Sequence, residues 1–463
     1  MIRLLVCVVA VLSTLTLSAG DAGALNGAWR GELKLGISRV PLVFNFSSDA
    51  SGNTLCTIDS PAQGAKDIQA EVTFISHDSV AVSCRLIGAA YGGVIRPGRI
   101  VGRFSQRGYE LPLELVPDES VAQRRPQTPA PPFPYTVVDT VFYAPDGVAL
   151  SGTLTLPAGG GRQKFPAVVM VSGSGPQNRD EEVFEHKPFA VIADFLARNG
   201  IASLRYDDRG VGESGGEFGE ATTYTFRDDA SSAVDFLRSV NEVSRIGVLG
   251  HSEGGTIAFM IAADGNVDFV VSLAGMAESG KETLLRQNSR ALDKMGLAGD
   301  DKETALRLIE LGFDAIAEQM YSGQRAPIDV DSLVAASGLQ APVALISSLK
   351  GAQSSRSLWL DTMLTLNPRD YIVKVKCPVL AVGGGKDTQV SPDNLTVISE
   401  CAPQAEILMA PELNHMMQHA VTGDTSEYYS IRETVSPDVL DAIVRFIREH
   451  FASESGRKVD VGN

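Results

Sequence analysis

Two different patterns of hydrophobic and polar positions divide the chain into two regions. From about Leu25 to Pro117, short segments such as EVTFIS and VAVSCRL alternate apolar and polar residues, and Gly, Asn, Asp and Ser separate them. A period of two with frequent turns is typical of antiparallel strands that have one buried face. We therefore expect residues 25–117 to form a small antiparallel β domain, either a barrel or a sandwich.

The second pattern begins after a proline-rich stretch, RRPQTPAPPFPY. This stretch indicates a semi-rigid linker at residues 118–135. Next, TVVDTVFYAPDGVALSGTLTLP predicts two strands around an Asp146-Gly147 turn. Continuous apolar strands then alternate with helices up to residue 455. Residues 136–455 therefore predict an α/β domain, a mostly parallel sheet with helices on both faces.

One long insertion interrupts this alternation at about residues 277–376. It contains helix-like segments such as ETALRLIELGFDAIAEQM and no clear strand. We expect a helical cap that crosses the C-terminal edge of the sheet, where it would roof a site. Its apolar residues Leu358, Trp359 and Met363 either line an acyl pocket or form the core of the cap itself.

The first 24 residues have the pattern of a secretory signal peptide. Arg3 precedes an apolar run, and Ala22-Gly23-Ala24 provides a small-residue cleavage site before Leu25. We expect an exported chain, periplasmic or secreted, that is free of the membrane once the signal is removed. An uncleaved membrane anchor is the alternative, although the apolar run is short for a bilayer span.

Charge and cysteine content narrow the possible partners. A formal net charge of −16 over 463 residues argues against nucleic acid and anionic lipid as partners. In an exported protein, the four cysteines outside the leader either form the disulfides Cys56–Cys84 and Cys377–Cys401 or remain thiols. Their spacing is not that of a zinc site, so we expect no metal.

Two serines lie in the spacing Gly-x-Ser-x-Gly. Ser252 follows the apolar stretch RIGVL and precedes a helix that opens at Gly254, and such a strand-to-helix turn exposes a strained serine above a sheet. Ser214 lies in YDDRGVGESGGEF, which is too glycine-rich and irregular to flank such a turn. We predict that Ser252 is a nucleophile and that Ser214 is a loop residue.

A nucleophilic serine needs an imidazole oriented by a carboxylate, and on this type of turn the chain order is Ser, acid, His. Asp387 follows the buried strand PVLAVGG, and His415 lies in the loop after the next strand. Both therefore belong at the same sheet edge as Ser252, which predicts a catalytic triad. His251 and His419 are weaker candidates for the base, because His251 is expected to be structural and His419 lies further along the chain than His415. Asp393 is a weaker candidate for the acid, because it begins or caps a helix.

Acyl transfer also requires N–H donors for the developing oxyanion. The backbone N–H of Glu253, directly after the nucleophile, is the first expected donor. The second lies in the loop Ser172-Gly173-Ser174-Gly175-Pro176, where Pro176 has no N–H. We predict Ser174 as the second donor, with Gly175 as the alternative.

Residues 135–455 resemble the α/β-hydrolase superfamily. The segments that carry this resemblance are VSGSGPQNRDE, LRYDDRGVGESGG, GHSEGG, GGGKDTQVSP and LNHMMQ, in that order. The chain is most similar to exported or cytosolic esterases and serine aminopeptidase-like hydrolases with a helical cap. Many such relatives have His-Gly where this chain has Ser172-Gly173.

These observations predict a hydrolase that cleaves small-molecule carboxylic esters through an acyl-enzyme and needs no cofactor. One alternative is a serine aminopeptidase, in which Glu181, Glu182 and Glu185 would recognise a free amine; otherwise these residues form a solvated acidic stretch. The other alternative is a ligand-binding protein that acts through its N-terminal β domain.

Overall fold

The computed structural model describes eight stretches of the chain: residues 25–35, 38–49, 52–61, 65–118, 125–159, 164–339, 343–354 and 356–451. The chain divides into two compact units, Met1–Ser120 and Val121–Asn463. The predicted signal peptide lies outside the described residues. Within them, no helix has both the length and the apolar character that crossing a bilayer requires.

The first unit is a closed antiparallel barrel in which each strand pairs with the next and β1 pairs with β8. Closure leaves no unpaired sheet edge. Aromatic and aliphatic side chains fill its interior, with Phe44 and Tyr91 packed at a centroid distance of 5.1 Å. The prediction of a small antiparallel β domain is confirmed, in its barrel form. The strands are β1 Gly27–Leu35, β2 Ser38–Ser48, β3 Thr54–Ser60, β4 Ala65–Ile75, β5 Ser79–Cys84, β6 Ala89–Arg96, β7 Arg99–Gln106 and β8 Tyr109–Pro117.

The second unit contains an eight-stranded sheet with the order β16-β15-β14-β13-β11-β12-β10-β9. From β12 through β16 neighbouring strands are parallel, whereas β9 and β10 pair antiparallel. The predicted α/β class with a mostly parallel sheet is confirmed. The strands are β9 Thr136–Tyr143, β10 Ala149–Leu156, β11 Phe165–Val171, β12 Ala202–Tyr206, β13 Val243–His251, β14 Phe269–Leu273, β15 Val379–Gly384 and β16 Ala405–Ala410.

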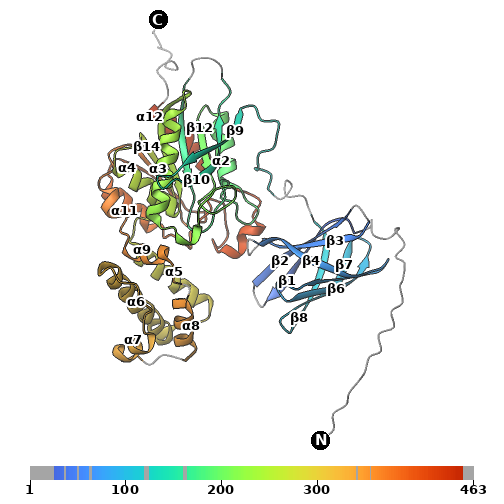
Figure 1. Cartoon of the computed structure of the whole chain (residues 1–463). Coiled ribbons are helices and arrows are strands. Elements are labelled where there is room, and N and C mark those ends of the chain that lie inside the picture. Colours follow the sequence, from blue (N-terminus) through green and yellow to red (C-terminus); the bar gives the residue numbers. More distant parts are fainter. Residues whose placement is uncertain are drawn as a thin grey trace. The chain divides into compact units, whose positions relative to one another are not determined.

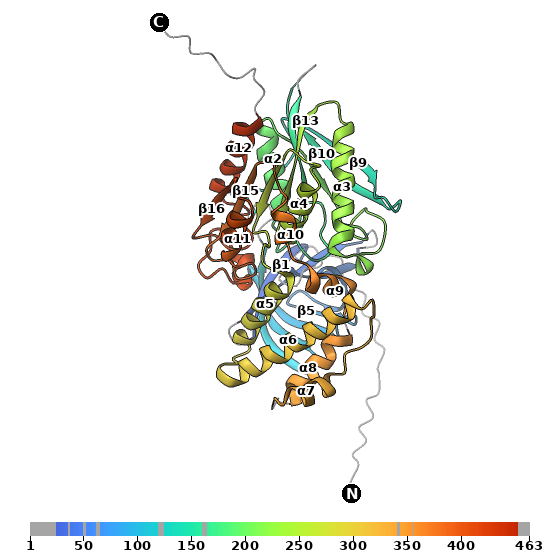
Figure 2. The same ribbon diagram turned by 90° about the vertical axis from the view of Figure 1, so that its left-hand side faces the viewer.

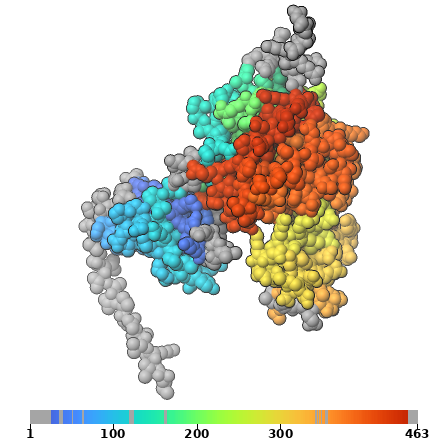
Figure 3. All heavy atoms as spheres, turned by 180° about the vertical axis from the view of Figure 1, so that it is seen from behind, coloured from blue at the N-terminus to red at the C-terminus, as the bar shows by residue number. Residues whose placement is uncertain are grey.

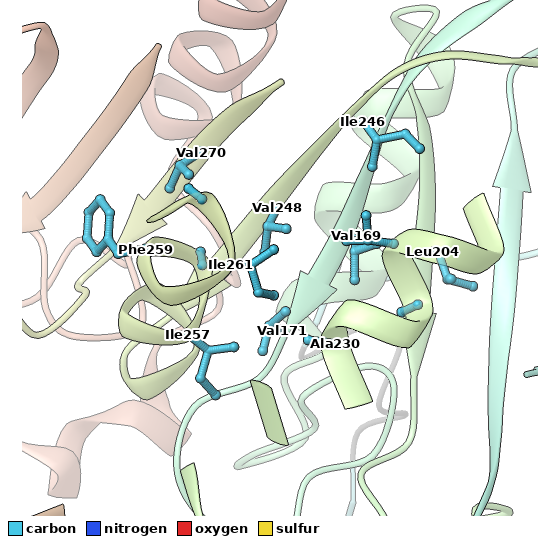
Figure 4. Close-up of a cluster of buried hydrophobic side chains, with 14 of the residues drawn as sticks. Val169, Val171, Leu204, Ala230, Ile246, Val248, Ile257, Phe259, Ile261 and Val270 are labelled. Atoms are coloured by element: carbon cyan, nitrogen blue, oxygen red, sulfur yellow. The ribbon is translucent and has the colours of Figure 1, made fainter. Parts of the chain in front are cut away.

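Helices cover both faces of this sheet (Figures 1 and 2). Alternate residues of each buried strand contribute to two hydrophobic clusters, because successive side chains of a strand point to opposite faces. One cluster packs against α3 and α4, where Val169, Val248 and Ile257 meet (Figure 4). The other packs against α2 and α12. Helix α11 also packs against the first cluster. The helices on the two faces are α2 Pro188–Arg198, α3 Thr223–Ser239, α4 Glu253–Ala263, α11 Asp393–Cys401 and α12 Pro437–Phe451.

The insertion between β14 and β15 is helical, with no strand among its described residues. Helices α5 to α9 gather at one end of the α/β unit, whereas α10 lies beside α4 and contributes Ile372 to the core of the sheet domain (Figures 1 and 2). Figure 3 shows the yellow segment that includes α5 beside the C-terminal part of the chain. The pair Lys294–Asp424, with its Nζ and Oδ2 2.5 Å apart, joins these segments. The cap helices are α5 Gly280–Lys294, α6 Gly299–Tyr321, α7 Val330–Ser337, α8 Val343–Ser354, α9 Leu358–Thr365 and α10 Arg369–Ile372.

Candidate active site

Ser252 lies on the sharp turn between β13 and α4. Its φ and ψ are 54° and −119°, a conformation that is strained for any residue with a Cβ. The N–H of Ser252 donates to the carbonyl of Leu273 on the neighbouring strand at 2.9 Å. The turn therefore holds the serine at the C-terminal edge of the sheet, as the sequence predicts for a nucleophile.

Glycines on either side of Ser252 allow this turn to close. A Cβ added to Gly254 would lie 2.0 Å from the carbonyl oxygen of Val171, and one added to Gly250 would lie 2.0 Å from that of Gly254. Strand and helix backbones are thus too close for any side chain at these two positions. The Gly-x-Ser-x-Gly spacing has a steric cause here.

Asp387 and His415 form a buried acid–imidazole pair. Asp387 follows β15 and His415 follows β16, and the distance between His415 Nδ1 and Asp387 Oδ2 is 2.7 Å. The other carboxylate oxygen of Asp387 accepts the backbone N–H groups of Gln389 and Val390 at 2.7 and 2.9 Å. Because Nδ1 is held by the acid, Nε2 is the imidazole nitrogen available to accept a proton.

His251 connects the serine turn to the loop that carries His415. The rings of His251 and His415 lie 4.7 Å apart, and His251 Nε2 donates to the backbone carbonyl of His415 at 2.9 Å. The strands β13 to β16 are consecutive neighbours, so their C-terminal ends share one edge. Ser252 therefore lies at the same edge as Asp387 and His415, and His251 has the structural role that we expected.

Glu181 holds His251 from the other side. Its Oε1 lies 2.8 Å from His251 Nδ1 and also accepts the N–H of Gly173 at 2.7 Å. Burial alone would lower the pKa of His251, but the neighbouring Glu181 carboxylate outweighs it and raises the pKa to about 9. Both ring nitrogens face acceptors, which agrees with a protonated imidazole.

This arrangement corrects both interpretations for Glu181 itself. Glu181 is only 3% exposed, so it is not part of a solvated face, and its carboxylate is already engaged by His251 and Gly173. The sequence gives no signal for this pairing, because Glu181 and His251 are 70 positions apart. Glu182 forms an ion pair with Lys187, with 3.5 Å between Oε2 and Nζ.

The two predicted oxyanion donors come from different segments of the chain. Glu253 is the first residue of α4, and Ser174 belongs to the loop after β11. Gly173 lies close to the nucleophile, because a Cβ added to it would be 3.1 Å from the Cβ of Ser252. No described residue accepts a hydrogen bond from the N–H of Ser174 or Glu253. Both assignments remain predictions.

Buried carboxylates after β12 fix the loop that carries Ser174. Asp208 accepts the N–H of Gln177 at 3.0 Å, and Asp207 accepts the N–H of Arg179 at 2.7 Å. Burial raises the pKa of Asp208 well above its usual value. The Asp207-Asp208 pair therefore sets the backbone path of the loop between Ser174 and Glu181.

The cap makes direct contact with the residue after the nucleophile. Trp359 Nε1 donates to both carboxylate oxygens of Glu253 at 2.9 and 3.0 Å, and Thr223 Oγ1 donates to Oε1 at 2.5 Å. Trp359 also packs with Met276 and Met363 in a cluster shared by cap and sheet domain. It therefore belongs to a contact between the cap and the sheet domain rather than to the core of the cap alone. Nothing in the sequence pattern indicated this contact.

The remaining candidates lie in structural positions. The Oγ of Ser214 donates to the carbonyl of Asp207 at 2.7 Å and accepts the N–H of Ser151 at 2.9 Å, which makes it a loop bridge. His419 is exposed and bonds to Glu433, and Asp393 begins α11.

All four cysteines outside the leader are free thiols, so neither of the two possible disulfides forms. Burial raises the pKa of Cys56 to about 12 and that of Cys377 to about 11, which keeps both thiols protonated near neutral pH. The described residues contain no cluster of three His, Cys, Asp or Glu that could hold a metal ion.

Comparison with known proteins finds similarity over most of the α/β unit. Residues 146–418 match a family model described as X-Pro dipeptidyl-peptidase (S15 family). Esterase EstD of Thermotoga maritima is 30% identical over 305 residues, which cover 64% of this chain and 65% of that esterase. The match thus spans just under two thirds of the esterase's length. An acyl transferase of Photobacterium phosphoreum is 30% identical over 89 residues, 19% of this chain and 29% of that protein.

Among solved structures, Est1E from Butyrivibrio proteoclasticus aligns with a TM-score of 0.42 and 18% sequence identity. The alignment covers 68% of this chain and 99% of Est1E.

Proposed function

We propose that this chain, which belongs to the X-Pro dipeptidyl-peptidase (S15) family within the α/β-hydrolase superfamily, is a serine hydrolase that cleaves carboxylic esters. The observation that carries the proposal is the 2.7 Å contact between His415 Nδ1 and Asp387 Oδ2, at the sheet edge where Ser252 occupies a strained turn. This combination of nucleophile, base and orienting acid is what acyl transfer requires.

The proposed reaction proceeds through an acyl-enzyme. Ser252 Oγ attacks the ester carbonyl carbon while His415 Nε2 takes its proton, and Asp387 stabilises the imidazolium that forms. The N–H groups of Glu253 and Ser174 bind the oxyanion. His415 then gives the proton to the leaving alcohol, and water, activated by the same imidazole, releases the acid and regenerates Ser252.

Peptide cleavage is the second candidate, and the family match favours it. Removal of residues from an N-terminus needs a carboxylate that binds the free amine. Glu181 is a poor candidate for that task, because it is buried against His251 and Gly173. Glu181 is thus removed as an amine-binding acid and Glu182 already pairs with Lys187, and together with the similarity to Esterase EstD this makes us prefer esters.

Substrate comparison distinguishes the two candidates. We expect the full-length protein to hydrolyse p-nitrophenyl acetate and butyrate and to leave aminoacyl- and X-Pro-p-nitroanilides intact at equal protein concentration. Ser252→Ala should abolish ester turnover, whereas Ser214→Ala should retain it. Turnover confined to the anilides would replace the esterase proposal with the peptidase one.

We also propose that the chain is exported, on the basis of the leader pattern in residues 1–24. N-terminal sequencing of the mature protein from its native host should give Leu25 as the first residue. A mature chain that retains the leader would contradict this proposal.

A further inference from the structure

The helical cap contains an apolar cavity of about 80 Å³ between α6, α7, α8 and α9. Aliphatic and aromatic side chains such as Ile309, Phe313 and Val330 form its wall. Cavities lined by aliphatic and aromatic side chains can bind apolar molecules. None of the lining residues is Ser252, Asp387 or His415.

Arg356 is the one charged side chain in the wall of this cavity, and one of its nitrogens lacks a partner. Its side chain is 6% exposed. Nε donates to Asp361 at 2.5 Å, and Nη1 donates to Gln319 and to the carbonyl of Ala326 at 2.8 and 3.0 Å. Nη2 is buried and makes no hydrogen bond among the described residues. A buried charged donor without an acceptor is unfavourable and calls for an explanation.

The charge balance around Arg356 favours an anion. Asp361 is fully buried and is shared by two guanidinium groups, since Arg325 Nε also donates to it at 2.8 Å. Two cations against one carboxylate leave a net charge of +1 at this end of the cavity. A guanidinium with a free N–H pairs well with a carboxylate oxygen.

We propose that this cap cavity is a binding site for a short-chain aliphatic carboxylate. The alkyl tail packs among the apolar side chains of α6 and α7, and the carboxylate accepts the N–H of Arg356 Nη2. The site is separate from the proposed catalytic residues and does not depend on the reaction they perform. Leu360 lines the cavity and directly follows Trp359 on α9. A ligand in the cavity therefore contacts the helix from which Trp359 donates to the carboxylate of Glu253.

Calorimetric titration of the full-length protein with hexanoate, 1-hexanol and hexylammonium tests the chemistry of the site. The three probes share one tail and differ in the charge of the head group. We expect hexanoate to bind at least tenfold more tightly than 1-hexanol and hexylammonium to bind most weakly. Hexanoate that binds no better than 1-hexanol, or not at all, would overturn the proposal.

Gly312 provides a matched pair of variants that locates the binding. It lies in the middle of α6 and lines the cavity, and a Cβ added there meets nothing within 4 Å. Ala and Leu both favour a helix more than Gly does, so neither change should unfold the cap. Gly312→Leu should weaken hexanoate binding at least tenfold by filling the cavity, whereas Gly312→Ala should change it less than twofold.

Both Gly312 variants should keep the circular-dichroism spectrum and the unfolding midpoint of the unmodified protein, which serves as the check on folding. Equal hexanoate affinity in Gly312→Leu and the unmodified protein would place the binding elsewhere and refute the cap site. Arg356→Gln adds a second readout, because it should remove the preference for hexanoate over 1-hexanol.

Discussion

The indole N–H of Trp359, in the cap, donates to the carboxylate of Glu253, the residue that directly follows Ser252. Glu253 is 2% exposed, and burial raises the pKa of its carboxyl group, while hydrogen bonds from Thr223 and Trp359 oppose that rise. The contact fixes the first turn of α4. It thereby fixes the backbone N–H of Glu253, which we propose as an oxyanion donor. The cap and the turn that carries Ser252 are thereby linked through one side-chain pair.

Trp359→Phe should lower kcat for p-nitrophenyl butyrate by about tenfold, which corresponds to ~1.4 kcal/mol of transition-state stabilisation. The ring is kept but the N–H is lost, so Glu253 gains freedom to shift the oxyanion donor. KM should change less than kcat, because the interaction supports the transition state.

Trp29→Phe is the control for this variant. Trp29 Nε1 donates to the carbonyl of Leu25 at 2.8 Å within the barrel, and its loss should leave kcat unchanged. An unaltered kcat in Trp359→Phe would show that the cap contact has no positioning role.

Ser252→Ala and Ser214→Ala separate the two serines that share one spacing. We expect Ser252→Ala to reduce kcat at least about a thousandfold, as removal of a nucleophile does in serine hydrolases. Ser214→Ala removes two hydrogen bonds of a loop and should lower stability by about 1 kcal/mol each while kcat is retained. Ester-hydrolysis assays measure kcat, and chemical denaturation measures the free energy of unfolding. The opposite ranking of kcat would assign the chemistry to Ser214.

Asp387→Asn should reduce kcat by about 10³- to 10⁴-fold, because an amide cannot stabilise the charged imidazole of His415. Asp393→Asn is the matched control on the same loop–helix segment. Asp393 begins α11 and accepts the Ser391 hydroxyl at 2.9 Å, so its replacement should leave kcat within about twofold. Equal losses in the two variants would remove Asp387 from the triad.

The fold was predictable wherever one local rule applied along a whole segment. Period-two alternation indicated the barrel strands, and continuous apolar runs with helices between them indicated the parallel sheet. The positions of Ser252, Asp387 and His415 followed from chain order and strand ends. The contacts between side chains that are distant in sequence did not follow. Glu181 reaches His251 across 70 positions, and Trp359 reaches Glu253 across 106, through loop and helix placements that no local pattern encodes.

The pair His251–Glu181 predicts a pH dependence of stability. The pKa of His251 is raised from 6.5 to about 9, so the folded protein holds this proton more tightly than the unfolded chain does. The resulting stabilisation is complete below pH 6.5, declines as the pH rises from 6.5 to 9 by about 1 kcal/mol per pH unit, and is absent above pH 9.

Glu181→Gln keeps the shape of the side chain and removes its charge. The difference in the free energy of unfolding between the unmodified protein and this variant should therefore narrow between pH 6.5 and 9. Urea denaturation at pH 6, 7, 8 and 9 measures it. A difference that stays constant or widens with pH would mean that His251 is neutral in the folded protein.

Covalent labelling tests the central claim, that Ser252 is the nucleophile, most directly. The full-length protein is incubated with a fluorophosphonate, and its proteolytic peptides are mapped by mass spectrometry. The account predicts a single phosphonyl adduct on Ser252, loss of ester turnover in proportion to labelling, and no adduct in Asp387→Asn over the same time. An adduct on another residue, or an unlabelled Ser252 in protein whose ester turnover has been abolished, would contradict it.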